Sequence, residues 1–282
     1  MRTSPQLLFW RGARKAGLLA RLNLETSTRW EGMRIRVPLL HGLGLANLAG
    51  SEPHFVALIE TLLRDKAGTF VDVGANLGQT LLKWHVVRTR LGLRSDYIGF
   101  DVDPVVVSYV HRLIAANKIA DANIVAAGLS DQTRLGRLTF NADGDGTASV
   151  IQGFRKRQHA FAKTITLARG DDLLESHASR ITLIKIDVEG GELEVLRGLR
   201  RTLEQHRPAV ICEVLPVYDE ATENGAFRRQ RTDATEALMR DAGFDLHQIH
   251  ADGVIARLER ITTHGDLALT NFLWLPREAA SR

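Results

Sequence analysis

The chain has 282 residues, of which 44% are hydrophobic and 25% are charged, and this suits one α/β domain with an extension. The single Cys212 excludes an intramolecular disulfide framework and a multi-cysteine zinc site. Because no apolar run approaches the roughly 20 residues of a membrane span, and no clean apolar leader precedes the domain, we expect a cytoplasmic protein.

The net charge of +4 is unevenly distributed along the chain. Residues 1–36 hold eight basic and two acidic side chains, so the remainder is slightly acidic, and we expect no nucleic-acid partner. Residues 5–22 mix apolar and basic side chains and predict a helix. We favour a helix that packs on the domain with a solvated basic face. Weak contact with the inner face of the membrane, through this basic N-terminus, is the alternative.

Residues 32–38 alternate apolar and basic side chains and predict an edge strand. Pro53 opens a predicted helix with apolar residues on one face up to Gly68. We therefore place a basic extension, a helix plus an edge strand, in residues 1–50, and the main domain in residues 51–282.

The segment from residue 70 to residue 80 organises the main domain. A β-branched apolar run carries Asp72, glycines follow at 74 and 78, and a helical pattern then begins. This order predicts a strand, a tight turn and a helix, the first βα unit of a nucleotide-binding sheet. Glycines in the turn allow a ligand to approach the backbone closely. The spacing Asp-x-Gly-x-x-x-Gly is not the dinucleotide fingerprint Gly-x-Gly-x-x-Gly.

Further βα units follow this first unit. Apolar runs predict strands, and the 3.6-residue pattern predicts helices, at positions that alternate along the chain. The predicted strands cover residues 97–101, 123–127, 181–187 and 208–213, and the predicted helices cover residues 104–117, 171–176 and 193–199.

Two segments depart from this alternation. Residues 136–167 contain no helical pattern and predict an antiparallel insertion of two or three strands, with a basic loop at 155–157. Residues 219–231 are polar and predict a loop or a mobile lid, before a helix over 235–242 and closing strands near 244–249 and 267–275. The predicted fold class is α/β: a Rossmann-like, mostly parallel, doubly wound sheet with an antiparallel closing hairpin.

Four predicted parallel strands end on or next to an acid. These acids are Asp72, Asp101, Asp187 and Glu213. Parallel strands present their carboxyl ends along one edge, where doubly wound folds bind their ligands. Asp101 lies 23 residues after Gly78, where such folds hold ribose hydroxyls. An edge lined with carboxylates favours a neutral or cationic ligand over a polyphosphate.

The sequence resembles the FkbM family of S-adenosylmethionine-dependent methyltransferases from about residue 52 to residue 276. Its most specific block is Ile-Asp-Val-Glu-Gly at residues 186–190. Asp101 stands where the family commonly has Glu followed by Pro, and Gly191 stands where Ala is usual. The other blocks that carry the resemblance lie at residues 72–79, 99–104, 128–131 and 208–213.

The resemblance implies a class I methyltransferase fold, S-adenosyl-L-methionine (SAM) as the cofactor, and O-methylation of a hydroxyl on a sugar, glycolipid or secondary metabolite. The acceptor would thus be a small molecule or a glycan. The resemblance also implies that the Gly74–Gly78 turn holds the methionine part of SAM, that Asp101 holds the ribose, and that Ser130 and Asp131 border the adenine. The predicted cofactor-binding residues are Asp72, Gly74, Ala75, Asn76, Gly78, Gln79, Asp101, Ser130, Asp131 and Asp187.

Transfer of a methyl group to an alcohol needs a group that accepts the hydroxyl proton. We predict Asp187, Glu189 and Glu213 as catalytic residues, because clustered carboxylates raise one another's pKa and one could act as a base near neutral pH. Asp187 and Glu189 could instead cap the helix that begins near Gly191. The three acids could gather magnesium, but no histidine–carboxylate spacing requires a metal, and we predict none.

Two other functions stay open on the sequence. The βαβ unit and Asp101 also suit an NAD-binding oxidoreductase, although the dinucleotide fingerprint is missing and the closing strands are antiparallel. A non-catalytic scaffold with a methyltransferase-like fold is the other alternative, and the complete set of acids argues against it. In the methyltransferase, we expect the segments 141–163 and 215–232 to shape the acceptor pocket.

Overall fold

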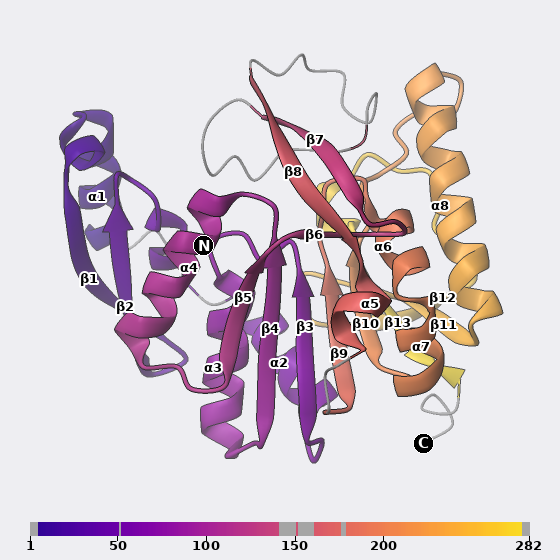
Figure 1. Ribbon diagram of the computed structural model, residues 1–282, viewed down its shortest axis with the longest axis horizontal. Coiled ribbons are helices and arrows are strands. Elements are labelled where there is room, and N and C mark those ends of the chain that lie inside the picture. The colour runs from indigo at the N-terminus through magenta and orange to yellow at the C-terminus, as the bar shows by residue number, and fades with distance from the viewer. Residues whose placement is uncertain (1–4, 51, 141–150, 152–160, 176–178, 278–282) are drawn as a thin grey trace.

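The computed structural model describes residues 5–50, 52–140, 151, 161–175 and 179–277. At its centre is an eight-stranded sheet with the order β12-β11-β13-β10-β9-β3-β4-β5 (Figure 1). The five strands from β10 to β5 are parallel, which confirms the doubly wound α/β class. These strands are β3 (Gly68–Val73), β4 (Ser95–Asp101), β5 (Ala122–Ala126), β9 (Ile181–Ile186) and β10 (Ala209–Glu213).

The closing strands extend the sheet beyond β10. β13 (Asn271–Pro276) is antiparallel both to β10 and to β11 (Phe244–Ile249), so the predicted antiparallel closure is confirmed. β12 (Ile255–Leu258) adds an edge strand that the sequence did not predict. Its residues are all at least partly exposed, so it lacks the apolar pattern of a buried strand.

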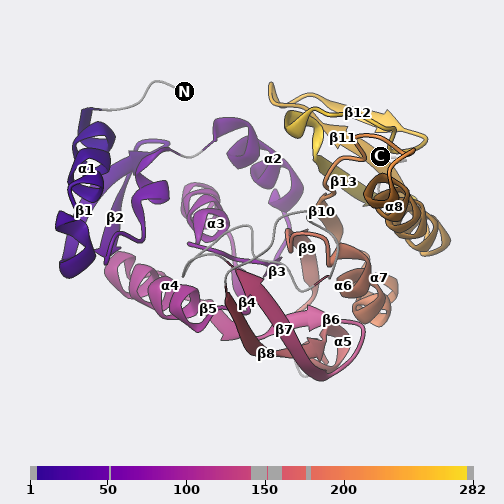
Figure 2. The same ribbon diagram turned by 90° about the horizontal axis from the view of Figure 1, so that it is seen from above.

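Helices cover both faces of this sheet (Figure 2). α2 (Pro53–Leu63), α3 (Gln79–Leu91) and α4 (Pro104–Asn117) share one hydrophobic cluster on one face. The opposite face carries a second cluster, which includes residues of the remaining helices. These are α5 (Gly170–Leu174), α6 (Glu192–Gly198), α7 (Arg200–His206) and α8 (Glu223–Asp241).

The prediction of a loop or lid over residues 219–231 is wrong. Most of that segment belongs to α8, which continues without a break through the helix predicted near its end. The buried face of α8 is made largely of polar and charged side chains, including Arg228, Arg229, Thr232 and Glu236. Because these side chains find their partners inside the protein, the helix has no apolar stripe that a sequence pattern could reveal.

The N-terminal region forms its own small sheet against α4. β2 (Met33–Leu40) confirms the predicted strand, but it pairs with the unpredicted β1 (Asn23–Trp30) and not with the edge of the main sheet. Asn117 of α4 bonds both the backbone N–H and the carbonyl of Arg36, each at 2.8 Å. The region begins with α1 (Pro5–Lys15) and a 3₁₀ turn, η1 (Leu18–Arg21), and a second 3₁₀ turn, η2 (Leu45–Leu48), follows β2.

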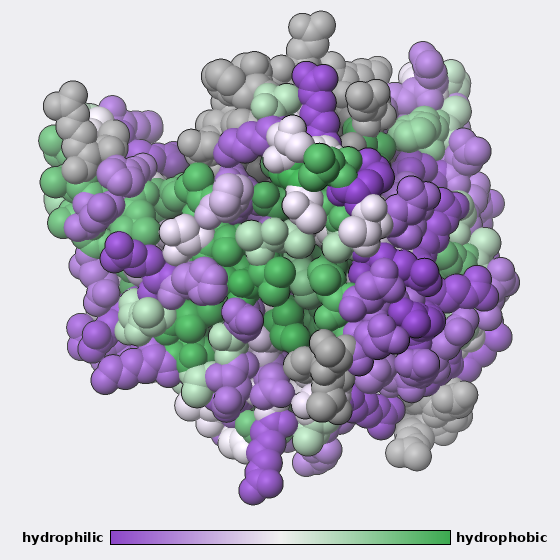
Figure 3. Space-filling model, in the orientation of Figure 1, coloured by the Kyte–Doolittle hydropathy of each residue, from purple (hydrophilic) through white to green (hydrophobic). Residues whose placement is uncertain are grey.

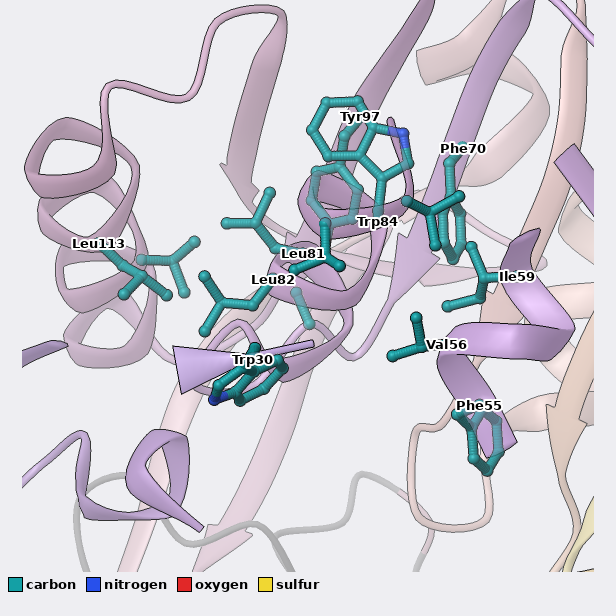
Figure 4. Close-up of a cluster of buried hydrophobic side chains, with 14 of the residues drawn as sticks. Trp30, Phe55, Val56, Ile59, Phe70, Leu81, Leu82, Trp84, Tyr97 and Leu113 are labelled. Atoms are coloured by element: carbon teal, nitrogen blue, oxygen red, sulfur yellow. The ribbon is translucent and has the colours of Figure 1, made fainter. Parts of the chain in front are cut away.

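The hairpin shares its hydrophobic core with the main sheet. Trp30 of β1 is fully buried and lies near Leu81 and Leu82 of α3, while Trp84 of the same helix packs toward Tyr97 (Figure 4). Full burial of a large apolar side chain contributes about 1.5–3 kcal/mol to stability. The N-terminal hairpin therefore contributes fully buried side chains to the core of the main sheet. The predicted boundary between residues 50 and 51 stays a prediction.

The predicted antiparallel insertion is confirmed as a second small sheet. β7 (Arg134–Phe140) and β8 (Phe161–Arg169) form a hairpin that rises above the carboxyl ends of the parallel strands (Figure 1). β6 (Gly128–Ser130), which the sequence did not predict, pairs with β8 in parallel. The basic loop at 155–157 lies outside the described residues, as does most of the segment 141–163.

The surface differs between the two ends of the molecule. In the view of Figure 3, the side of α7 and α8 is mostly hydrophilic, whereas apolar surface shows over the N-terminal region. Leu8, Phe9 and Leu18 are each more than half exposed there. Within the described ranges, no helix combines the length and the hydrophobicity needed to cross a membrane.

Candidate functional site

A cavity of about 360 Å³ opens at the carboxyl ends of the parallel strands. The chain leaves β3 toward β4 and β5 on one side and returns through β9 and β10 on the other. Such a reversal of strand order leaves a crevice at the sheet edge, where α/β proteins bind ligands. Seven predicted site residues line this cavity: Gly74, Asn76, Asp101, Ser130, Asp187, Glu189 and Glu213.

The turn between β3 and α3 forms one wall. Gly74, Asn76 and Gly78 all have positive φ values, of 84°, 44° and 76°. A Cβ added at Gly74 would lie 1.9 Å from the carbonyl oxygen of Asp187, so both the backbone conformation and the close approach require glycine there. The turn therefore lies directly against the strand end that carries the predicted catalytic residues.

Asp101 holds this turn in place from the neighbouring strand. One carboxylate oxygen accepts the backbone N–H of Asn76 and the other accepts that of Asp103, each at 2.9 Å. Burial raises the pKa of Asp101, although these N–H groups oppose the shift. The predicted ribose-binding residue thus faces the cavity. It also anchors the turn over residues 74–78, the predicted cofactor turn.

Five predicted cofactor residues do not line the cavity: Asp72, Ala75, Gly78, Gln79 and Asp131. Asp72 is fully buried and accepts the hydroxyl of Tyr97 at 2.5 Å, and burial raises its pKa to about 6. Gln79 donates to the carbonyl of Ala46 in the N-terminal region. Asp131 accepts the hydroxyl of Ser130 at 3.2 Å. The structure gives these three residues supporting contacts outside the cavity lining.

The three predicted catalytic acids, Asp187, Glu189 and Glu213, come together at the opposite wall of the cavity, called the acidic wall below. Carboxylate oxygens of Asp187, Glu189 and Glu213 lie within 4.8 Å of one another. Glu213 also accepts the hydroxyl of Thr270 at 3.1 Å. Glu189 has a φ of 54°, an uncommon conformation for a residue with a Cβ, and such strain collects at functional sites.

Lys185, which the sequence analysis overlooked, lies beside Asp187 and lowers the pKa of that acid. Its ammonium lies 2.9 Å from a carboxylate oxygen of Asp187, on the same face of β9, and the side chain is only 14% exposed. Asp187 and Asp72 hold the pKa of Lys185 above its usual value against the effect of burial. The spacing Lys-Ile-Asp, two residues apart on one strand, was the available signal.

The expected mutual rise in pKa is found at one acid and reversed at another. Burial and the neighbouring Asp187 charge raise the pKa of Glu213 to about 8. Burial also works to raise the pKa of Asp187, but the Lys185 ammonium and a hydrogen bond with Glu213 hold it below its usual value. The lowered pKa of Asp187 and the raised pKa of Glu213 favour an ionised Asp187 and a protonated Glu213 at neutral pH.

Asp187 does not cap the helix that follows it, α6. α6 has Gly191 as its N-cap residue, without a side-chain cap, and Glu192 accepts the N–H of Gly190 at 2.9 Å. Three carboxylates so close could also coordinate a hard cation, although Lys185 already places one positive charge beside them.

Arg231 of α8 is a second residue that the sequence analysis missed. It donates to Glu194 at 2.9 Å and to the carbonyl of Gly190 at 2.8 Å, and its side chain is 16% exposed. Glu194 lines the cavity, and Gly190 belongs to the turn that carries Glu189. Arg231 therefore ties α8 to the acidic wall. The wrong prediction of a loop over this segment hid it.

Comparisons with known proteins show what this chain is similar to. The family model of the methyltransferase FkbM domain matches residues 72–246. The methyltransferase sdnD of Sordaria araneosa is 27% identical over 220 residues, covering 68% of this chain and 79% of that protein.

Similar solved structures include a methyltransferase FkbM from Methylobacillus flagellatus KT, with a TM-score of 0.45 and 15% identity. The alignment covers 74% of this chain and 43% of that one, so this chain spans less than half of that protein's length. Another is the SAH-bound Podospora anserina methyltransferase PaMTH1, with a TM-score of 0.41, 10% identity, and coverage of 79% and 77% of the two chains.

Proposed function

The chain belongs to the FkbM family of methyltransferases, and from this premise we propose that it transfers the methyl group of SAM to a hydroxyl of a sugar, glycolipid or secondary metabolite. The family match decides against an NAD-binding oxidoreductase. The observation that supports the proposal is the cavity, which has the glycine turn and Asp101 on one wall and the carboxylates of Asp187 and Glu213 on the other.

The cofactor would lie across the first wall. Each carboxylate oxygen of Asp101 has two lone pairs, so it can accept a ribose hydroxyl in addition to the backbone N–H that it already binds. The turn at Gly74 and Asn76 would receive the methionine part, and Ser130 would border the adenine. The sulfonium of SAM is a cation, and the acidic wall would stabilise it.

The acidic wall would also accept the proton of the acceptor. Methyl transfer is an in-line displacement: the oxygen–carbon bond forms as the carbon–sulfur bond breaks, and the sulfonium becomes the neutral thioether of S-adenosylhomocysteine (SAH). The hydroxyl proton must leave with this step. Asp187 is ionised at neutral pH and would accept it, and Glu213 becomes a second acceptor as the pH approaches 8.

Calorimetric titration with SAM, SAH and NAD tests the cofactor. We expect SAM and SAH to bind and NAD not to bind. In Asp101→Ala, the loss of hydrogen bonds to a charged acceptor should weaken SAH binding by roughly 1.5–3 kcal/mol, which is tenfold or more. Unchanged SAH affinity in a folded Asp101→Ala variant would remove Asp101 from the site.

Turnover tests the reaction itself. SAH release is measured with a panel of hydroxylated sugars and phenols as acceptors. SAH release that depends on one of these acceptors supports the methyltransferase activity. Loss of this release in Asp187→Asn supports the role of Asp187 as the proton acceptor. Binding of none of the three ligands would favour the non-catalytic scaffold.

A further inference from the structure

The 3₁₀ turn η2 of the N-terminal region touches the cofactor turn. Asn47 is completely buried and donates from its side-chain amide to the carbonyl of Leu77 at 2.8 Å. The same amide donates to the hydroxyl of Tyr109 in α4 at 3.1 Å. The backbone carbonyl of Asn47 accepts the indole N–H of Trp30 at 3.1 Å. One residue thus joins the hairpin, α4 and the turn between β3 and α3.

A second bond links the same two segments. Gln79, the first residue of α3, donates to the carbonyl of Ala46 at 3.3 Å. Leu77 and Gln79 flank Gly78, so η2 contacts the cofactor turn on both sides of its second glycine. Gly44 makes this approach possible, because it has a φ of 93° and a Cβ there would lie 2.5 Å from the Tyr109 hydroxyl.

The cofactor turn needs such support. Three of its five residues have positive φ, and Asn76 among them is not glycine. Residues in sparsely populated conformations persist only where their surroundings over-determine them. Asp101 holds the turn through the N–H of Asn76 on the cavity side. Asn47 holds the carbonyl of the next residue, Leu77, from the core side.

We propose that Asn47 is a positioning residue for the cofactor turn, through which the β1–β2 hairpin and η2 of the N-terminal region take part in binding the methyl donor. The inference rests on the proposed function, because it takes this turn as the SAM site. Without the amide of Asn47, the Leu77 carbonyl loses its donor and the turn samples other conformations. The cofactor then binds only those molecules in which the turn is ordered, and its apparent affinity is reduced in proportion to the fraction of such molecules.

The experiment compares Asn47→Leu with Ser95→Ala in the full chain. Ser95 is 2% exposed and accepts the indole N–H of Trp84 at 3.1 Å, so each substitution removes a buried hydrogen bond from the same region of the protein. Both variants should lose thermal stability. Asn47→Leu should weaken SAH binding at least fivefold in calorimetry, the worth of one ordinary hydrogen bond, whereas Ser95→Ala should stay within twofold of the natural protein.

Tyr109→Phe provides a third variant, because it keeps the Asn47–Leu77 bond and should leave SAH affinity nearly unchanged. If Asn47→Leu does not fold, Asn47→Ser replaces it. Hydrogen exchange of the peptide spanning residues 74–80, without ligand, should be faster in the Asn47 variant than in Ser95→Ala.

Equal SAH affinity in Asn47→Leu and the natural protein would overturn the part of Asn47 in cofactor binding. Equal exchange rates in the turn would overturn its positioning role. Failure of the natural protein to bind SAH would overturn the proposed function instead, and the exchange rates would still decide whether Asn47 positions the turn.

Discussion

At the scale of single residues, one lysine separates two acids that the sequence makes look alike. Asp187 and Glu213 end neighbouring parallel strands, yet the first has a lowered pKa and the second a raised one. Lys185 lies against Asp187, while Glu213 accepts the neutral hydroxyl of Thr270. The division into an ionised and a protonated carboxyl follows from this asymmetry.

Glu213 should make the protein less stable as the pH rises. Its pKa is about 8 in the folded state against its usual 4.5, so the folded protein keeps a proton that the unfolded chain has lost. The stability from this proton is full below pH 4.5 and is lost as the pH rises through 8. Glu213→Gln cannot ionise. Relative to the natural protein, its Tm should therefore be about 3 °C or more higher at pH 8.5 than at pH 5.

The comparison is made as a difference between variant and natural protein, because other groups titrate in the same range. Burial raises the pKa of Asp72 to about 6 and that of Glu192 to about 7, and both are present in the two proteins. A Tm difference that is the same at both pH values would show that Glu213 does not hold its proton in the folded state.

At the scale of elements, a helix or strand could be predicted from the sequence only where it carries an apolar run or stripe. The strands β3, β4, β9 and β10 and the helices α2 to α4 carry apolar runs or stripes, and the sequence placed them correctly. β1 and α8 carry none. The burial of α8 depends on arginines that bond carbonyls and acids far along the chain, as Arg229 does with Ile261 and Arg231 does with Glu194. Such partners cannot be found before the fold is known.

Arg231 should couple α8 to the cavity. Arg231→Gln removes its paired bonds to Glu194 and Gly190, so the turn that carries Glu189 is no longer held, and we expect SAH binding about tenfold weaker. SAH lacks the sulfonium charge and therefore reports on geometry. Arg229→Gln is the matched control, since Arg229 lies on the same helix and its side chain is 9% exposed against 16% for Arg231, but it bonds Asp233 and Ile261.

Both variants should lower the Tm, because each leaves buried acids or carbonyls without a donor. Only Arg231→Gln should change the affinity for SAH. Equal losses of affinity in the two variants would mean that α8 acts through overall stability and not through the turn.

At the scale of the whole molecule, the site could be predicted in outline because topology brings it together. The carboxyl ends of parallel strands meet at one edge whatever their distance in sequence, so the acids and the glycine turn could be assigned to one cleft. The position of the N-terminal hairpin could not be predicted, because β1 is half exposed and largely polar. The contact of Asn47 with the cofactor turn depends on that placement.

The N-terminal region also bears on the prediction of weak membrane contact. Leu8 and Phe9 are exposed on α1, and basic side chains surround them in the sequence. If the region binds membranes, attachment to vesicles containing phosphatidylserine should weaken steeply with salt, because surface charge is screened over about 8 Å at physiological ionic strength.

The variant for this test is Leu8→Ser with Phe9→Ser. Removal of residues 1–50 is unsuitable, because it would also strip Trp30, Val37 and Leu39 from the core. Equal vesicle binding by the double variant and the natural protein would leave α1 as a helix that packs on the domain.

The position of β13 has a consequence for the synthesis of the protein on the ribosome. β13 follows every other described strand in sequence, yet it lies inside the sheet, between β10 and β11. Until it has emerged, β10 is an open edge that could pair with another nascent chain, and Glu213 lacks Thr270. The cofactor turn is translated some 200 residues before β13, so the acidic wall is completed much later than the turn that it faces.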